Sequence, residues 1–167
     1  VSDLGGATVG AKAAHPGWTS LNYAFFPAYP FAMRAVGWAL TPFGLDPVAR
    51  VTLAGVLVSL AGTLAALIAI ADLAAGERGA GQGEGLRAAA YRLGWPASLF
   101  LAQVYTEGQF LGLSFGALAL ARRDRWLWAG LLAALAAWTR STGALLVLPL
   151  AWMWLGQGGW SRLRAQP

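Results

Sequence analysis

Residues 126–155 read WLWAGLLAALAAWTRSTGALLVLPLAWMWL, an apolar stretch that carries a single charge, Arg140, near its centre. Leu93–Ala121 has the same form, with Glu107 as its only charge. A charge at the centre of a bilayer costs about 3 kcal/mol or more, and such residues usually face a bundle interior or a watery cavity. We therefore expect an integral membrane protein with a polar site at membrane depth.

The composition points the same way. The chain is 57% hydrophobic and 11% charged, whereas soluble domains carry roughly 25% charged residues. It has no Cys and one His, His15, so the sequence offers no disulfide framework and no visible metal-ligand cluster. The net charge of +5 lies in short clusters between apolar segments, which is typical of orientation signals rather than of nucleic-acid binding. We expect no metal, no cofactor and no nucleic-acid partner, and no phosphate-cradling glycine motif is present.

A third apolar run, Val51–Ile70, is long enough to cross a hydrocarbon core, which needs about 20 residues. Gly55, Ser59 and Gly62 fall on one face of this helix, so a neighbouring helix can approach it closely. Asp46 precedes Pro47 and is a candidate N-cap for the helix.

Two shorter elements flank this run. Phe31–Leu40 is expected to form a short helix. Ala74–Arg92 is expected to be a Gly-rich loop that ends in a short amphipathic helix from Gly85.

The two charged stretches are awkward as single spans. Gly94–Ala121 would be about 42 Å long as a straight helix, and arginines flank both stretches at both ends. A single crossing would violate the positive-inside rule. Two short helices joined near the far side satisfy it, with breaks at Tyr105–Gly108 and Thr139–Gly143. The alternative is two tilted full-length spans with buried charges.

This arrangement predicts the topology. Residues 1–30 form an extracytoplasmic loop with an aromatic, proline-broken box, and residues 31–167 form one helical membrane region. The arginine clusters at Ala74–Arg92, Arg122–Arg125 and Arg162–Arg164 lie on the cytoplasmic side, and both charged apices lie outside or close to it. The chain is expected to be part of a larger multi-pass protein.

Two charged side chains are the main candidates for chemistry. The guanidinium of Arg140 offers a rigid fork of donors that matches a phosphate. Glu107 could act as a base, as a ligand for a hydroxyl or cation, or as the ion-pair partner of Arg140. In the last case the pair would be structural and would still shape the site. For Arg140 the structural alternatives are an ion pair or a helix cap. Phe26 and Tyr29 could shape a lipid or sugar pocket, or could simply anchor the chain at the interface.

Three boxes occur in a recognisable order. Ala24–Pro30 resembles an FFPLYP box, Trp95–Phe100 with Val104–Phe110 resembles an FPAS…VYTESLF stretch, and Ala121–Arg123 with Leu135–Leu148 resembles an AARR…LTRPTGxLL stretch. Together they make the chain similar to PIG-V-like mannosyltransferases, the family related to GPI mannosyltransferase 2. The resemblance runs from about Ala24 to Leu150.

The resemblance implies a glycosyltransferase of the GT-C class, an all-α polytopic bundle with short or broken helices. It implies transfer of a sugar, with mannose expected, from a polyprenyl-phosphate donor to a lipid or glycan acceptor. The reaction would occur on the extracytoplasmic face, here expected to be that of a bacterial plasma membrane. The residues carried over as substrate or lipid-phosphate contacts are Arg140, Glu107, Tyr105, Thr139, Phe26 and Tyr29.

The catalytic residue is not expected in this chain. Inverting transfer needs a carboxylate that accepts the proton of the acceptor hydroxyl, a role that the family gives to an Asp after a Trp in the first outward loop. No Trp-Asp pair occurs here, and Asp3 follows Ser2. We expect the catalytic Asp upstream of Val1 and no activity from this piece alone. The chain also departs from the family boxes at Ala28, Gly108-Gln109 and Ser141.

Two other functions compete with a transferase. Broken helices with a charge at the break are also a transporter device, so a transporter or lipid flippase segment is one alternative. A non-catalytic membrane subunit is the other. Internal symmetry would favour the transporter, and the absence of an upstream Trp-Asp loop would favour the subunit.

Overall fold

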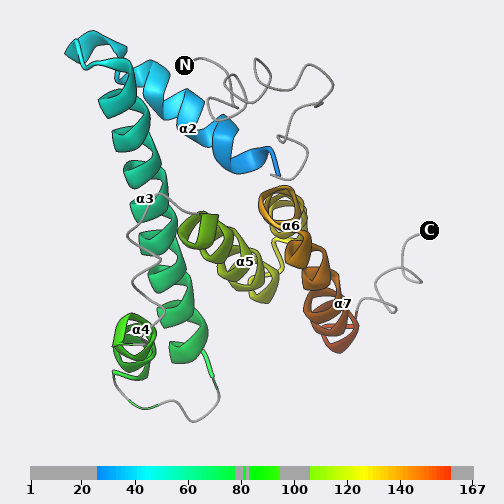
Figure 1. Ribbon diagram of the computed structural model, residues 1–167. Helices are drawn as coiled ribbons and strands as arrows, with labels where there is room; N and C mark the ends of the chain where they lie inside the picture. Colours follow the sequence, from blue (N-terminus) through cyan, green and yellow to red (C-terminus); the bar gives the residue numbers. More distant parts are fainter. Residues whose placement is uncertain (1–25, 78–80, 82, 95–105, 159–167) are drawn as a thin grey trace.

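A computed structural model of the chain describes residues 26–77, 81, 83–94 and 106–158, and the regular structure of this part is helical throughout (Figure 1). The expected all-α class is confirmed for these residues. The elements in chain order are α2 (Ala28–Ala39), the 3-10 helix η2 (Thr41–Phe43), α3 (Pro47–Ala75), α4 (Glu84–Gly94), α5 (Thr106–Arg122), α6 (Trp126–Thr139), the 3-10 helix η4 (Ser141–Leu146) and α7 (Val147–Gly156).

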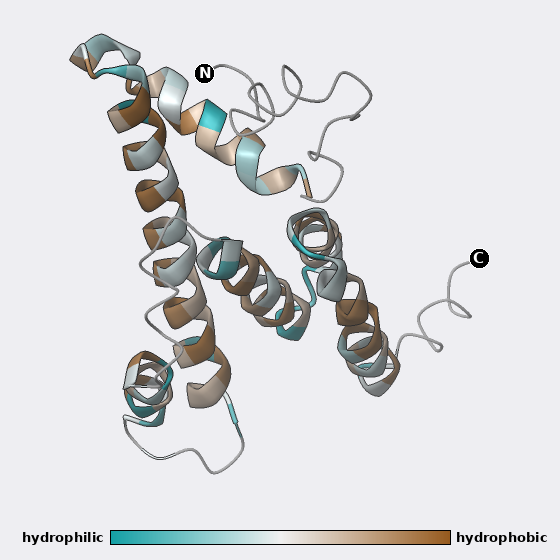
Figure 2. Ribbon diagram, in the orientation of Figure 1, coloured by the Kyte–Doolittle hydropathy of each residue, from teal (hydrophilic) through white to brown (hydrophobic). Residues whose placement is uncertain are grey.

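Helix α3 is the long axis of the described structure. Its 29 residues extend about 43 Å at 1.5 Å per residue, beyond the predicted Val51–Ile70 run at both ends. The predicted cap is confirmed: the carboxylate of Asp46 accepts hydrogen bonds from the Ala49 N–H at 3.2 and 3.3 Å, and Pro47 opens the helix. In Figure 2 the apolar residues run along the whole of α3.

Among the described helices, α3 is the one long and apolar enough to cross a membrane. Helix α6 and the continuous η4–α7 segment are apolar but have fewer than 18 residues each, so each is short for a full crossing. A single such helix leaves the multi-pass arrangement a prediction.

Helices α3 and α5 touch main chain to main chain. A Cβ atom added at Gly62 would lie 2.5 Å from the backbone nitrogen of Gln109, and one at Gly112 would lie 2.5 Å from the carbonyl oxygen of Gly62. A Cβ at Gly108 would overlap the carbonyl oxygen of Ser59. The close approach predicted for this face of α3 is therefore confirmed, and its partner is α5.

Helix α2 begins at Ala28, three residues before the predicted start at Phe31. Pro30 lies in the first turn, where the missing N–H has no intrahelical partner to lose. The proline-broken box therefore runs into the helix, and the boundary expected at residue 30 is shifted.

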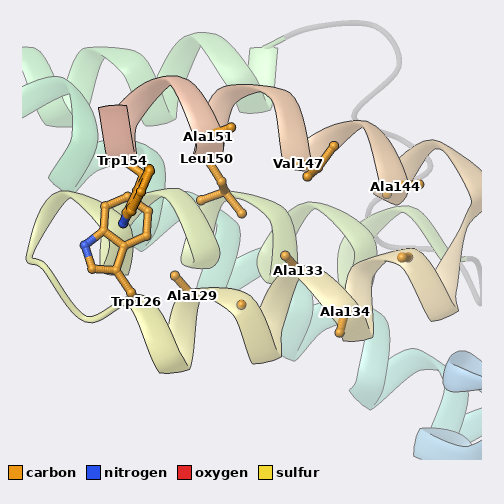
Figure 3. Close-up of a pocket in the computed structure, with 12 residues that line it drawn as sticks. Trp126, Ala129, Ala133, Ala134, Ala144, Val147, Leu150, Ala151 and Trp154 are labelled. Atoms are coloured by element: carbon orange, nitrogen blue, oxygen red, sulfur yellow. The ribbon is translucent and has the colours of Figure 1, made fainter. Parts of the chain in front are cut away.

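Helices α6 and α7 form a hairpin. Arg140 follows α6 in an extended conformation, with φ −152° and ψ 145°, and η4 then turns the chain so that η4–α7 runs back beside α6 (Figure 3). The predicted break at Thr139–Gly143 is confirmed. Helix α5 begins at Thr106, inside the other predicted break, while residues 95–105, which include the first arm of that stretch, lie outside the described residues.

The end of α3 is held by α5. The guanidinium of Arg122 donates to the carbonyl oxygens of Leu73 at 2.6 Å and Gly76 at 2.5 Å, and lies 3.4 Å from the carboxylate of Glu77. The last carbonyls of a helix lack intrahelical donors, and a cation there complements the helix dipole. Arg122 thus fixes where α5 ends relative to α3, a role that the sequence did not reveal.

Candidate functional site

The N-terminal end of α5 meets the C-terminal end of α6. Glu107 lies in the first turn of α5, and Arg140 is the residue after the last turn of α6. Their side chains form an ion pair in which Arg140 Nη1 donates to Glu107 Oε1. The two charges that the sequence singled out are therefore direct partners.

Helix dipoles favour both charges at these positions. The N-terminal end of a helix carries a partial positive charge and the C-terminal end a partial negative charge. Glu107 complements the first and Arg140 the second. The side chains are 29% and 34% exposed, so pairing also offsets much of the cost of removing each charge from water. Part of the reason for the pair is therefore structural.

A third side chain completes the contact. The guanidinium carbon of Arg140 lies 5.7 Å from the ring centroid of Phe110, which is within the range of a cation–π interaction. Phe110 is three residues after Glu107, so the two lie on the same face of α5. The spacing is visible in the sequence, but nothing there indicates that the ring covers Arg140.

The guanidinium keeps capacity to bind a ligand. It has five N–H donors, and Glu107 is the one hydrogen-bond acceptor that the described part of the chain supplies to it. A guanidinium that already holds one carboxylate can still bind an anion through its remaining donors.

The pair lies level with the middle of α3. Gly108, next to Glu107, packs against the main chain of Ser59, and Ser59 is roughly 13 residues, or about 20 Å, from both Asp46 and Asp72. Relative to α3, the pair lies near mid-length rather than at either end. The predicted depth of the site in a membrane stays a prediction.

Tyr29 lies at the same level of α3. Its hydroxyl donates to the carbonyl oxygen of Gly55 at 3.1 Å and is 2.9 Å from the hydroxyl oxygen of Ser59. The side chain is 6% exposed, so its polar atom is used in packing α2 on α3. Phe26, just before α2, is 42% exposed and remains accessible to a ligand.

Thr139 is satisfied within its own helix. Its hydroxyl donates to the carbonyl oxygen of Leu135 at 2.9 Å, and the residue is 2% exposed. The predicted contact of Thr139 with a substrate has no surface to use in this arrangement. The remaining predicted residue, Tyr105, lies outside the described residues.

An apolar groove of about 450 Å³ runs between α6 and the η4–α7 segment (Figure 3). One end lies between Trp126 and Trp154. Gly143, whose N–H donates to the carbonyl oxygen of Arg140 at 2.9 Å, is one of the lining residues. The volume is within the range of small-molecule and cofactor sites. The groove is lined by Trp126, Ala129, Gly130, Ala133, Ala134, Ala137, Gly143, Ala144, Val147, Leu150, Ala151 and Trp154.

Across the described ranges, no group of three or more His, Asp or Glu side chains could hold a metal ion. Comparison with protein-family models, curated proteins and solved structures finds no match to this chain. The similarity of its boxes to those of PIG-V-like mannosyltransferases stays a prediction from the residues.

Proposed function

We propose that this chain is part of a membrane glycosyltransferase that takes a sugar, with mannose expected, from a polyprenyl-phosphate donor. The observation that carries the proposal is the Glu107–Arg140 pair, which lies level with the middle of α3. Arg140 is also three residues before Gly143, which lines an apolar groove. A site for a lipid phosphate needs a cation with spare donors next to an apolar surface, and this region has both.

In this proposal Arg140 binds the donor phosphate. As the bond between the sugar C1 and the phosphate oxygen breaks, negative charge grows on the phosphate, and a fixed guanidinium stabilises that charge. The acceptor hydroxyl attacks C1 from the opposite face and loses its proton to a carboxylate, for which the upstream Asp is the candidate. Glu107 orients Arg140, and the polyprenyl chain lies in the groove between α6 and α7.

The second candidate is a transporter or lipid flippase. Helix α6 ends at Thr139, just before Arg140, and α7 begins only after the 3-10 turn of η4. Interrupted helices with a charge at the interruption form the binding sites of many transporters. A non-catalytic subunit would bind the lipid phosphate with the same residues and transfer nothing.

The test is transfer of radiolabelled mannose from polyprenyl-phosphate-mannose in membranes that contain the intact protein. We expect Arg140→Ala to lower transfer by about 100-fold or more, the usual effect of removing a donor that stabilises transition-state charge. Arg125→Ala is the matched control, because Arg125 is an exposed arginine at the opposite end of α6. Full activity of Arg140→Ala would overturn the assignment.

Arg140→Ala leaves Glu107 without its partner, so a second variant separates folding from chemistry. Glu107→Gln combined with Arg140→Gln removes both charges and keeps two side chains that can hydrogen-bond. A folded double variant without transfer would support Arg140 as the phosphate contact. An intact protein that moves lipid-linked sugar across vesicles but transfers none would favour the transporter.

A further inference from the structure

Helix α4 packs across the end of α3. In Figure 1, α4 is seen nearly end-on beside the C-terminal part of α3, whereas the axis of α3 lies in the plane of the picture. The two helices therefore cross at a steep angle. The contact is close: a Cβ atom added at Gly85 would lie 2.6 Å from the carbonyl oxygen of Ala71. A helix that crosses the end of a membrane span in this way lies along the membrane surface.

The outward surface of α4 is divided into an apolar and a polar stripe. Leu86, Ala90 and Leu93 have the spacing i, i+4, i+7 and are all exposed, with Leu86 at 77% and Leu93 at 51%. This spacing places the three side chains on one side of the helix. They form the apolar stripe.

The polar stripe lies beside it. Arg87 forms an ion pair with Glu84 at 2.9 Å, and Tyr91, four residues after Arg87, is 78% exposed. A tyrosine and an arginine next to exposed leucines are typical of side chains at the boundary between lipid and water.

We propose that α4 is an interfacial helix whose partner is the lipid surface of the membrane itself. Leu86, Ala90 and Leu93 lie against the acyl chains, and Arg87 and Tyr91 lie among the headgroups. The inference rests on α3 crossing the membrane, as the proposed function does. In this placement lipid covers the exposed apolar stripe of α4.

The proposal fixes the depth of the site. Ala71, where α4 packs, is 12 residues from Ser59, which is about 18 Å along α3. The hydrocarbon core is about 30 Å thick. With α4 in the interface, the Glu107–Arg140 pair lies near the bilayer centre, and α4 holds it there.

Site-directed spin labelling tests this placement. No cysteine occurs in these 167 residues, so Leu86→Cys, Leu93→Cys and Arg87→Cys each introduce a single thiol into this part of the protein. Any cysteine elsewhere in the intact protein is replaced by serine. The intact protein is labelled with a nitroxide and reconstituted into phosphatidylcholine–phosphatidylglycerol vesicles. Accessibility is measured with oxygen, which concentrates in lipid, and with a nickel complex, which stays in water.

We expect a several-fold higher oxygen-to-nickel ratio at positions 86 and 93 than at position 87. Leu64→Cys is the reference for lipid depth, because Leu64 lies in the middle of α3 and is 60% exposed. It should give the highest ratio of the four.

Three results would overturn the proposal. Equal water accessibility at positions 86 and 87 would place α4 in solvent, even with position 64 in lipid. Low accessibility to both reagents at positions 86 and 93 would mean that protein covers the stripe. Water accessibility at position 64 would show that α3 does not cross the membrane, and α4 could then not lie at the membrane surface. None of these readings depends on mannose transfer, so failure of the transferase assay alone leaves α4's placement intact.

Discussion

Two arginines end two helices of this molecule, and they bind different kinds of group. Arg122, the last residue of α5, donates to two main-chain carbonyls at the end of α3. Arg140, just after α6, donates to the side chain of Glu107 and lies over the ring of Phe110. Their exposed fractions are nearly equal, 30% and 34%, so burial does not separate them.

The nature of the acceptors separates the two arginines. A carbonyl at a helix end is fixed by the backbone and needs a donor, so Arg122 has a permanent structural task. A carboxylate on a side chain can rotate, and Arg140 keeps N–H donors beyond the one that Glu107 uses, so Arg140 can bind another anion. For arginines of similar exposure at helix ends, the type of acceptor therefore distinguishes a structural role from a binding role: main-chain carbonyls indicate structure, and a side-chain carboxylate leaves room for binding.

The largest effect on stability is expected from Glu107→Ala. Removing one partner of this partly buried ion pair costs roughly 2–3 kcal/mol, because the other charge is left uncompensated. Removing both charges with Glu107→Ala and Arg140→Ala should recover most of this loss. The measurement is a denaturant titration of the purified protein in detergent. A double variant as unstable as the single one would show that the charges do not compensate each other.

Arg122→Ala should have a smaller effect, about 2 kcal/mol, because it leaves carbonyls at the end of α3 without a donor. Arg123→Ala is the control: the ion pair of Arg123 with Asp72, at 2.6 Å, involves a side chain that is 61% exposed. An exposed pair contributes less than about 1 kcal/mol and weakens with salt. Thermal unfolding at low and high salt distinguishes the two. Sugar transfer per folded molecule should stay normal in both variants. A loss of transfer in Arg122→Ala alone would show that Arg122, like Arg140, contributes to activity.

The smallest effect is expected from Tyr29→Phe. This change removes a buried hydroxyl that bonds to the carbonyl of Gly55 and to Ser59, at a cost of about 1 kcal/mol. Tyr91→Phe removes the same group from an exposed ring and should leave unfolding unchanged. A large loss of transfer with little loss of stability in Tyr29→Phe would instead make Tyr29 a substrate contact.

The sequence predicted what local chemistry determines. Asp46 and Pro47 mark the start of α3 because a cap and a first-turn proline act within a few residues. The break at Thr139–Gly143 followed from polar, turn-compatible residues inside an apolar run. The pairing of Glu107 with Arg140 was one of the options, since they are the only charges in their stretches.

The remainder depends on packing between distant segments. The small residues on one face of α3 predicted a closely packed helix. The tertiary structure determines that this helix is α5, which contacts α3 through Gly108. Arg122 was interpreted as an orientation signal, because its bonds to carbonyls 46 and 49 residues away leave no local pattern. Thr139 was taken as a site residue from a family box, and its hydroxyl is used inside α6.

The contact between α3 and α5 also limits how this sequence can change over time. Where Gly62, Gly108 and Gly112 meet, the backbones leave no space for even one methyl group. A side chain at any of these three positions would force the two helices apart. Leu60 and Leu64 face outward, so they can be exchanged for other apolar residues. In divergent copies of this gene, the three glycines should persist after most of the surrounding helix surface has been rewritten.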